Sequence, residues 1–182
     1  MQYKVKVTVV DKKLYPELQR QYCADRDAGA CPLYNVGDEF LFERYAGKDD
    51  FWSMGRGSQC SEAWDAISRY IYTGLQGGAI MRGWMNDDRV MIVCCSDGTR
   101  PVIFKIERID YQAVYIDVLK DNSCRDKIKT ALLGLEHITQ VVFRKEEDFA
   151  EFAEIYVDSA VDYKKIVACV KALGDYKVQR IE

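Results

Sequence analysis

The stretch VMIVCCSDGTRPVIFKIERI, residues 90–109, decides the fold of the first half of the chain. Apolar and polar residues alternate on both sides of Asp97-Gly98, a pair typical of a two-residue hairpin turn. In that hairpin Cys95 shares a face with the most apolar side chains, and Cys94 lies on the opposite, mixed face. We therefore expect Cys95 to face the core and Cys94 to be the cysteine that reaches a cleft. A register shift of one residue would reverse this assignment.

The segments before the hairpin predict a mixed set of short elements. Strands are expected at 3–10 and 39–45, with a short helix at 14–23 between them. The segment CSEAWDAISRYIYTGLQGG, residues 60–78, has the periodicity of an amphipathic helix, which Ser61 can cap. Together with the hairpin, these elements make up a small mixed α+β domain at 1–110.

The rest of the chain has a different and more regular pattern. From residue 113 onward, strand and helix patterns follow one another in the order β-α-β-β-α-β, and Asp162 caps the last helix. That order is the split βαβ arrangement of ferredoxin-like domains. The sequence therefore predicts an α+β protein with two domains, the mixed domain at 1–110 and a ferredoxin-like βαββαβ domain at 111–182.

Composition and charge exclude several classes of protein. The chain has 182 residues, of which 48% are hydrophobic and 30% charged, so a packed core is expected. A net charge of -3 provides no basic field for nucleic acid or anionic lipid. No apolar run reaches membrane-spanning length, and the N-terminal segment lacks the apolar core of a signal peptide. We expect a cytoplasmic protein that binds neither nucleic acid nor membrane.

The cysteines are the main candidates for chemistry. There are seven of them, with no C-x-x-C spacing, and the chain has a single histidine, His137. In a reducing compartment they should be free thiols. Adjacent Cα atoms lie about 3.8 Å apart, which is too close for a disulfide between Cys94 and Cys95.

A thiolate-rich site forms if Cys31, Cys60 and either Cys94 or Cys95 converge. Such a site would hold Zn²⁺ or an iron–sulfur cluster. Cys60 lies at the start of the predicted helix, where the free N–H groups favour a thiolate. The alternative is that these cysteines are small buried hydrophobes, which is common for free cysteine.

The C-terminal part resembles the heavy-metal-associated domains of metallochaperones and metal-transport ATPases. The resemblance rests on VYIDVL (114–119), CRDKIKTAL (124–132) and DYKKIVACVKALGDYKV (162–178). It places Asp121 and Cys124 where that family carries its two metal-binding cysteines. One thiolate and one carboxylate suit a soft monovalent ion poorly.

The N-terminal half resembles a family of small uncharacterised prokaryotic proteins that has no established activity. Four segments carry this resemblance: YPEL (15–18), GACPLYNVGDEF (29–40), CSEAWDAISRYIYTGLQGG (60–78) and CCSDGTRPVIFKIERI (94–109). The resemblance implies a shared fold and no particular mechanism.

Three functional hypotheses follow. The first is a non-catalytic cytoplasmic binding or interaction protein, with a cysteine-based metal site in the N-terminal domain as a candidate. The second is a thiolate-dependent enzyme or redox protein using Cys60 or Cys31, although the chain has no nucleophile–base motif, phosphate loop or dinucleotide fingerprint. The third assigns function to the C-terminal domain, as a metallochaperone-like metal binder or as the surface for a protein partner or a homo-oligomer through edge strands.

Overall fold

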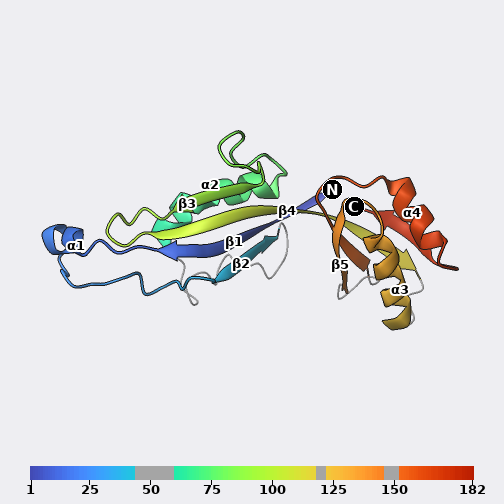
Figure 1. Ribbon diagram of the computed structural model, residues 1–182, viewed down its shortest axis with the longest axis horizontal. Helices are drawn as coiled ribbons and strands as arrows, with labels where there is room; N and C mark the ends of the chain where they lie inside the picture. The colour runs from blue at the N-terminus through green and yellow to red at the C-terminus, as the bar shows by residue number, and fades with distance from the viewer. Residues whose placement is uncertain (44–59, 118–121, 146–151) are drawn as a thin grey trace. The chain divides into compact units, whose positions relative to one another are not determined.

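The computed structural model describes residues 1–43, 60–117, 122–145 and 152–182 (Figure 1). Over these ranges the protein is a mixed α+β structure with four helices and a mostly antiparallel sheet. The chain divides into two compact units, Tyr3–Arg108 and Met1–Gln2 with Ile109–Glu182. The boundary between the units, after Arg108, lies within the long strand β4 (Val102–Asp117). The sequence analysis placed the domain boundary after residue 110.

The Tyr3–Arg108 unit is built on the strands β2 (Glu39–Glu43), β1 (Gln2–Lys12) and the first half of β4, in that order. β2 pairs antiparallel with β1, and β3 (Val90–Cys94) pairs antiparallel with β4. The short helix α1 (Pro16–Tyr22) begins with proline at a position where a missing N–H costs nothing.

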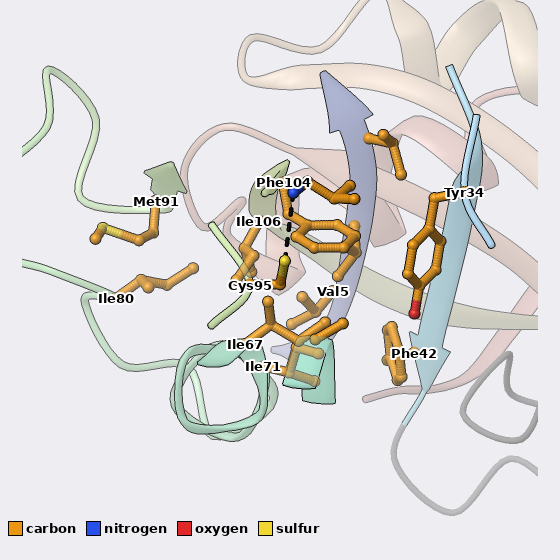
Figure 2. Packing of buried hydrophobic residues seen from close by; sticks show 14 residues of the cluster. Val5, Tyr34, Phe42, Ile67, Ile71, Ile80, Met91, Cys95, Phe104 and Ile106 are labelled. Atoms are coloured by element: carbon orange, nitrogen blue, oxygen red, sulfur yellow. Dashed lines mark hydrogen bonds between the residues drawn. The ribbon is translucent and has the colours of Figure 1, made fainter. Parts of the chain in front are cut away.

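The helix α2 (Ser61–Leu75) closes the core of this unit, and in Figure 1 it lies along β3. Ile67 and Ile71 point from α2 toward Phe104 and Val5 of the sheet, as Figure 2 shows. The helix begins at Ser61, but its cap position is Cys60, so the prediction that Ser61 caps it is wrong. The Ser61 hydroxyl donates instead to the carboxylate of Glu62, at 3.2 Å.

The hairpin of β3 and β4 has a longer connection than the sequence suggested. A two-residue turn at Asp97-Gly98 would pair Val93 with Val102. In the structure Val93 pairs with Phe104, and the Cys95 N–H donates to the Val102 carbonyl at 3.0 Å. The Asp97 carboxylate holds residues 96–101 as a wide turn, because it accepts the N–H groups of Thr99 (2.9 Å) and Arg100 (3.2 Å). The predicted two-residue turn is therefore wrong. The register differs by two residues, so the side chains keep the faces that the pattern predicted.

The second unit contains the second half of β4, then α3 (Asn122–Leu133), β5 (Ile138–Arg144), β6 (Phe152–Val157), α4 (Tyr163–Lys171) and β7 (Lys177–Ile181). Its strands lie in the order β7-β4-β6-β5, and all these pairs are antiparallel.

Both helices of the second unit contribute to one core with the sheet. Ile128 and Leu132 of α3 and Ile166 of α4 are fully buried there beside Val114 and Ile155. The predicted cap of α4 is confirmed, since the Asp162 carboxylate accepts the Lys164 N–H at 2.9 Å.

Candidate functional site

A cavity of about 500 Å³ opens in the Tyr3–Arg108 unit, and we call it the thiol-lined cavity. Three separate segments form its wall: the loop after α1, the start of α2 and the β3–β4 hairpin. Its lining residues are Cys31, Pro32, Leu33, Tyr34, Cys60, Glu62, Cys95, Asp97, Arg100 and Val102. Three of the predicted site cysteines therefore line one cavity, although they are far apart in the sequence.

Tyr34 is the buried polar group of this cavity. Its side chain is 1% exposed, and its ring packs edge-on against Phe104 with centroids 5.4 Å apart. Among the described residues its hydroxyl has no hydrogen-bond partner. Burial raises the pKa of Tyr34 well above its ordinary value, and the nearby thiols of Cys60, Cys31 and Cys95 add to the shift. The Cys60 N–H offsets this shift in part, without meeting the geometry of a hydrogen bond to the hydroxyl. The hydroxyl therefore keeps its proton and can donate it.

Two polar side chains, the partly buried Lys12 and the buried Gln19, hold the loop that carries Cys31 and Tyr34. The Lys12 ammonium donates to the carbonyl oxygens of both residues, at 2.6 Å each. The side chain of Gln19, on α1, bonds both backbone groups of Gly29, at 3.0 Å and 3.1 Å. These contacts hold the loop backbone against β1 and α1, so this part of the cavity wall is held by hydrogen bonds of the fold itself.

Cys95 and Cys94 lie on opposite faces of the hairpin. Cys95 is 8% exposed and its sulfur accepts the Val102 N–H at 3.3 Å, which is the dashed line in Figure 2. Cys94 is exposed. The prediction that Cys95 faces the core is confirmed, and the prediction that Cys94 reaches a cleft is wrong for this cavity. The reason is that the cavity opens on the core side of the hairpin.

Cys60 does not carry the activated thiolate that its place at the helix start suggested. Burial raises the pKa of the Cys60 thiol, and the Ala63 N–H of the first helical turn offsets only part of that rise. The Glu62 carboxylate accepts a hydrogen bond from the Cys60 thiol, with Sγ and Oε2 3.3 Å apart. This carboxylate raises the pKa of the Cys60 thiol further. At a helix start the dipole favours an anion, but here loss of water and a neighbouring carboxylate outweigh it.

Charged side chains line the cavity together with the thiols. Arg100 Nε contacts Asp97 Oδ2 at 3.0 Å, so the guanidinium and the carboxylate compensate each other. Glu62 is the other carboxylate of the lining, and its pKa is lowered by its own backbone N–H and by the Cys60 thiol and Ser61 hydroxyl.

The thiols do not form a ready-made metal centre. Across the described ranges, no group of three or more His, Cys, Asp or Glu side chains is placed to hold a metal ion. The expected zinc or cluster site at Cys31, Cys60 and either Cys94 or Cys95 is thus not preformed among these residues. In the second unit, Cys124 lies in α3 and is partly buried, and Asp121 lies outside the described residues.

The sequence analysis missed Tyr34 and Lys12. Tyr34 follows Cys31 by three residues, and in a loop no periodicity marks a tyrosine as buried. Lys12 is the last residue of a strand in which apolar and polar residues otherwise alternate. This pattern does not indicate that the Lys12 ammonium contacts the loop after α1. Their roles depend on the folded loop.

No family model, curated protein or solved structure matches this chain. The two family resemblances therefore stay predictions. In the part of the chain that the structure describes, no helix is both long enough and apolar enough to cross a membrane.

Proposed function

We propose that the protein is a non-catalytic cytoplasmic binding protein whose ligand occupies the thiol-lined cavity. The observation that carries this proposal is the hydroxyl of Tyr34 in the cavity wall, for which no described residue provides a hydrogen-bond partner. A buried polar group without a partner costs about 1–3 kcal/mol, and native structures contain few of them. A ligand that accepts this hydrogen bond removes that cost. The volume of about 500 Å³ is also typical of a small-molecule site.

The raised pKa of Cys60 favours binding over thiolate catalysis. A catalytic cysteine needs a depressed pKa or an adjacent base, and here burial acts in the opposite direction. The single histidine, His137, belongs to the other unit, where its ring nitrogen Nδ1 contacts Asp158 Oδ1 at 2.9 Å. An enzyme of the predicted thiolate class would use Cys60 or Cys31 as its nucleophile, and the described residues that line the cavity include no histidine.

For the second unit we propose a ferredoxin-like domain that serves association. The strand order β7-β4-β6-β5 supports the fold, because it corresponds to the order 4-1-3-2 of a split βαβ unit. β5 and β7 end this order, and end strands carry backbone groups that another chain can pair. Concentration-dependent mass in sedimentation equilibrium tests this role, and a monomer at every concentration would contradict self-association.

The binding proposal can be tested by titrating the ¹⁵N-labelled full chain with small aromatic amides such as benzamide. The amide carbonyl can accept a hydrogen bond from Tyr34, and the ring is small enough to enter the cavity. We expect saturable shifts at the amides of the lining residues. The matched control is Leu33→Trp, which adds a larger side chain to the cavity lining and keeps all of the cysteines. Equal shifts in both proteins would show that the cavity is not the site.

Alkylation separates binding from thiolate catalysis. We expect iodoacetamide at neutral pH to modify the exposed Cys94 faster than Cys60, because the raised pKa keeps the Cys60 thiol protonated. Peptide mapping gives the rate at each cysteine. A Cys60 or Cys31 that reacts much faster than Cys94 would favour the enzyme hypothesis instead.

A further inference from the structure

We propose that the thiol-lined cavity selects small monocationic ligands, namely amines that also carry a carbonyl group. This inference rests on the proposed binding function and names the chemical class of its ligand. It assigns the two ends of the ligand to two groups of the cavity lining. The carbonyl oxygen accepts a hydrogen bond from the Tyr34 hydroxyl, and the ammonium group pairs with the Glu62 carboxylate.

The charged groups of the cavity lining favour a cation over an anion. Among the described residues the lining contains two carboxylates, Asp97 and Glu62, and one guanidinium, Arg100. Asp97 is already compensated, since its Oδ2 atom contacts Arg100 Nε at 3.0 Å. The carboxylates therefore exceed the guanidinium by one, and the excess negative charge lies on Glu62.

Glu62 is ionised, and the described residues supply it with neutral partners. Its Oε2 atom accepts hydrogen bonds from the Cys60 thiol at 3.3 Å and from the Ser61 hydroxyl at 3.2 Å. Its own backbone N–H and these two donors lower the pKa of Glu62, so the side chain is charged at neutral pH. No Lys or Arg side chain of the described ranges lies within ion-pair distance of it. The ammonium group of a ligand is thus a partner that this carboxylate can take.

Tyr34 supplies an independent observation that points to a ligand. Its side chain is 1% exposed, and no described residue forms a hydrogen bond with its hydroxyl. Burial raises the pKa of this hydroxyl, and so do the thiols of Cys60, Cys31 and Cys95. All three thiols line the cavity, so the hydroxyl lies at the same wall and keeps its proton. A carbonyl oxygen accepts this proton in a hydrogen bond, whereas an ammonium group has no lone pair to do so.

One small ligand can reach both groups, because both adjoin Cys60. The Cys60 backbone N–H acts on the pKa of the Tyr34 hydroxyl, and Cys60 Sγ lies 3.3 Å from Glu62 Oε2. A cavity of about 150 Å³ is large enough for benzene, so the volume of about 500 Å³ leaves room for a substituted ring between the two polar ends. The apolar part of the lining includes Pro32, Leu33 and Val102.

The test compares three benzamides of similar shape by NMR titration of the ¹⁵N-labelled full chain. At neutral pH meta-aminomethylbenzamide is a cation, meta-methylbenzamide is neutral and meta-carbamoylbenzoate is an anion. All three present the same amide carbonyl to Tyr34. We expect the cation to bind about 5-fold tighter than the neutral amide, and the anion at least about 5-fold more weakly. The advantage of the cation should largely disappear in about 1 M NaCl, because Glu62 is exposed.

Two variants assign the ends of the ligand. Glu62→Gln keeps the size of the side chain and removes its charge, so it should weaken the cation about 5-fold and leave the neutral amide unchanged. Tyr34→Phe should weaken all three amides alike, by about 5-fold, because each carbonyl loses its donor. Asp65→Asn is the matched control, since Asp65 is an exposed carboxylate of the same helix α2 and is not part of the cavity lining. It should leave the three affinities unchanged.

Failure of this inference differs from failure of the proposed function. Circular dichroism checks that each variant is folded. Equal affinities of the three amides for the parent chain, or a cation preference that persists in Glu62→Gln, would overturn the charge selection while the binding function stands. An equal loss of that preference in Asp65→Asn and Glu62→Gln would overturn it as well, because the preference would then come from the general charge of the chain. If none of the three amides shifts the lining residues, both proposals fall.

Discussion

A tyrosine hydroxyl of the first unit and one of the second unit have different surroundings. In the Tyr3–Arg108 unit the Tyr34 hydroxyl is buried beside a cavity and has no hydrogen-bond partner among the described residues. In the second unit the carboxylate of Glu154, a residue 5% exposed, accepts the Tyr156 hydroxyl at 2.8 Å and Arg144 Nε at 3.3 Å. An unmet hydrogen bond costs stability, whereas a satisfied network contributes to it. The Tyr156 hydroxyl is therefore satisfied within the protein, whereas the Tyr34 hydroxyl has a donor that no described residue accepts.

The largest expected effect tests whether the units differ in stability as well. Phe104→Ala removes a fully buried ring from the core of the first unit and should destabilise it by about 3–5 kcal/mol. Leu132→Ala should cost the second unit about 2–5 kcal/mol.

Urea unfolding separates these two changes. The three tryptophans all precede residue 109, so tryptophan fluorescence reports on the first unit and far-ultraviolet circular dichroism reports on both. We expect the fluorescence transition to move more in Phe104→Ala than in Leu132→Ala. Equal movement would show that the units unfold as one, and the comparison would then break down for stability.

Substitution of Gly77 tests whether the Tyr3 ring can move aside in the first unit. Its φ is +75°, and an added Cβ would overlap the ring of Tyr3. Gly83 has a similar φ of +73° with nothing within 4 Å of the added atom. Gly77→Ala should cost about 2–4 kcal/mol and Gly83→Ala about 1–2 kcal/mol, because only the first adds overlap to backbone strain. Thermal denaturation of the pair measures the difference. Equal losses would mean that the Tyr3 ring moves aside.

The two tyrosines sharpen the comparison directly. Tyr34→Phe removes a hydroxyl that has no partner among the described residues and should leave stability unchanged or raise it by up to about 1 kcal/mol. Tyr156→Phe removes a donor from the buried Glu154 and should cost about 1–2 kcal/mol. Chemical denaturation of the ligand-free protein compares them. A loss in Tyr34→Phe as large as that in Tyr156→Phe would show that Tyr34 is satisfied within the fold.

The smallest expected effect is a dependence on acid at the turn before β3. Hydrogen bonds from the Arg89 side chain and backbone lower the pKa of Asp87 to about 2 from its ordinary 3.8. Since the folded pKa is the lower one, this stabilisation is present above pH 3.8 and is lost as the pH falls toward 2. The effect is small because the Asp87 side chain is 42% exposed.

Asp87→Asn provides the control for this dependence. The variant should lose less stability than the parent chain between about pH 5 and about pH 2, since it lacks the titrating carboxylate. Urea midpoints at several pH values measure the difference. Identical pH profiles for the two proteins would show that this pair contributes nothing to acid stability.

Local pattern was enough to predict most elements. The helix within 60–78 and the strand patterns on either side of Asp97-Gly98 were readable because hydrophobic periodicity is a property of neighbouring residues. The face of Cys95 was predicted correctly although the turn was not, because a two-residue shift preserves alternation. The wide turn itself depends on bonds from Asp97 to residues beyond it, which the Asp-Gly pair does not reveal.

The candidate site was only partly predictable. The sequence singled out Cys31, Cys60 and the pair at 94–95, and the structure brings three of these cysteines to one cavity. It also suggested that Cys60 is activated, which is wrong because ionisation depends on burial and on Glu62 as well as on the helix start. Tyr34 gave no signal, since the burial of a loop residue is decided by what packs over it.

The sequence by itself determined the α+β class, the main helices and strands, and which hairpin cysteine faces inward. Each of these follows from the spacing of apolar residues along a short segment. Only the tertiary structure decided that the loop after α1, the start of α2 and the β3–β4 hairpin meet around Tyr34. It also decided that the Cys60 thiol stays protonated and that Cys94 lies outside the lining of the thiol-lined cavity. Convergence and desolvation depend on residues far apart in the chain, and no local pattern encodes them.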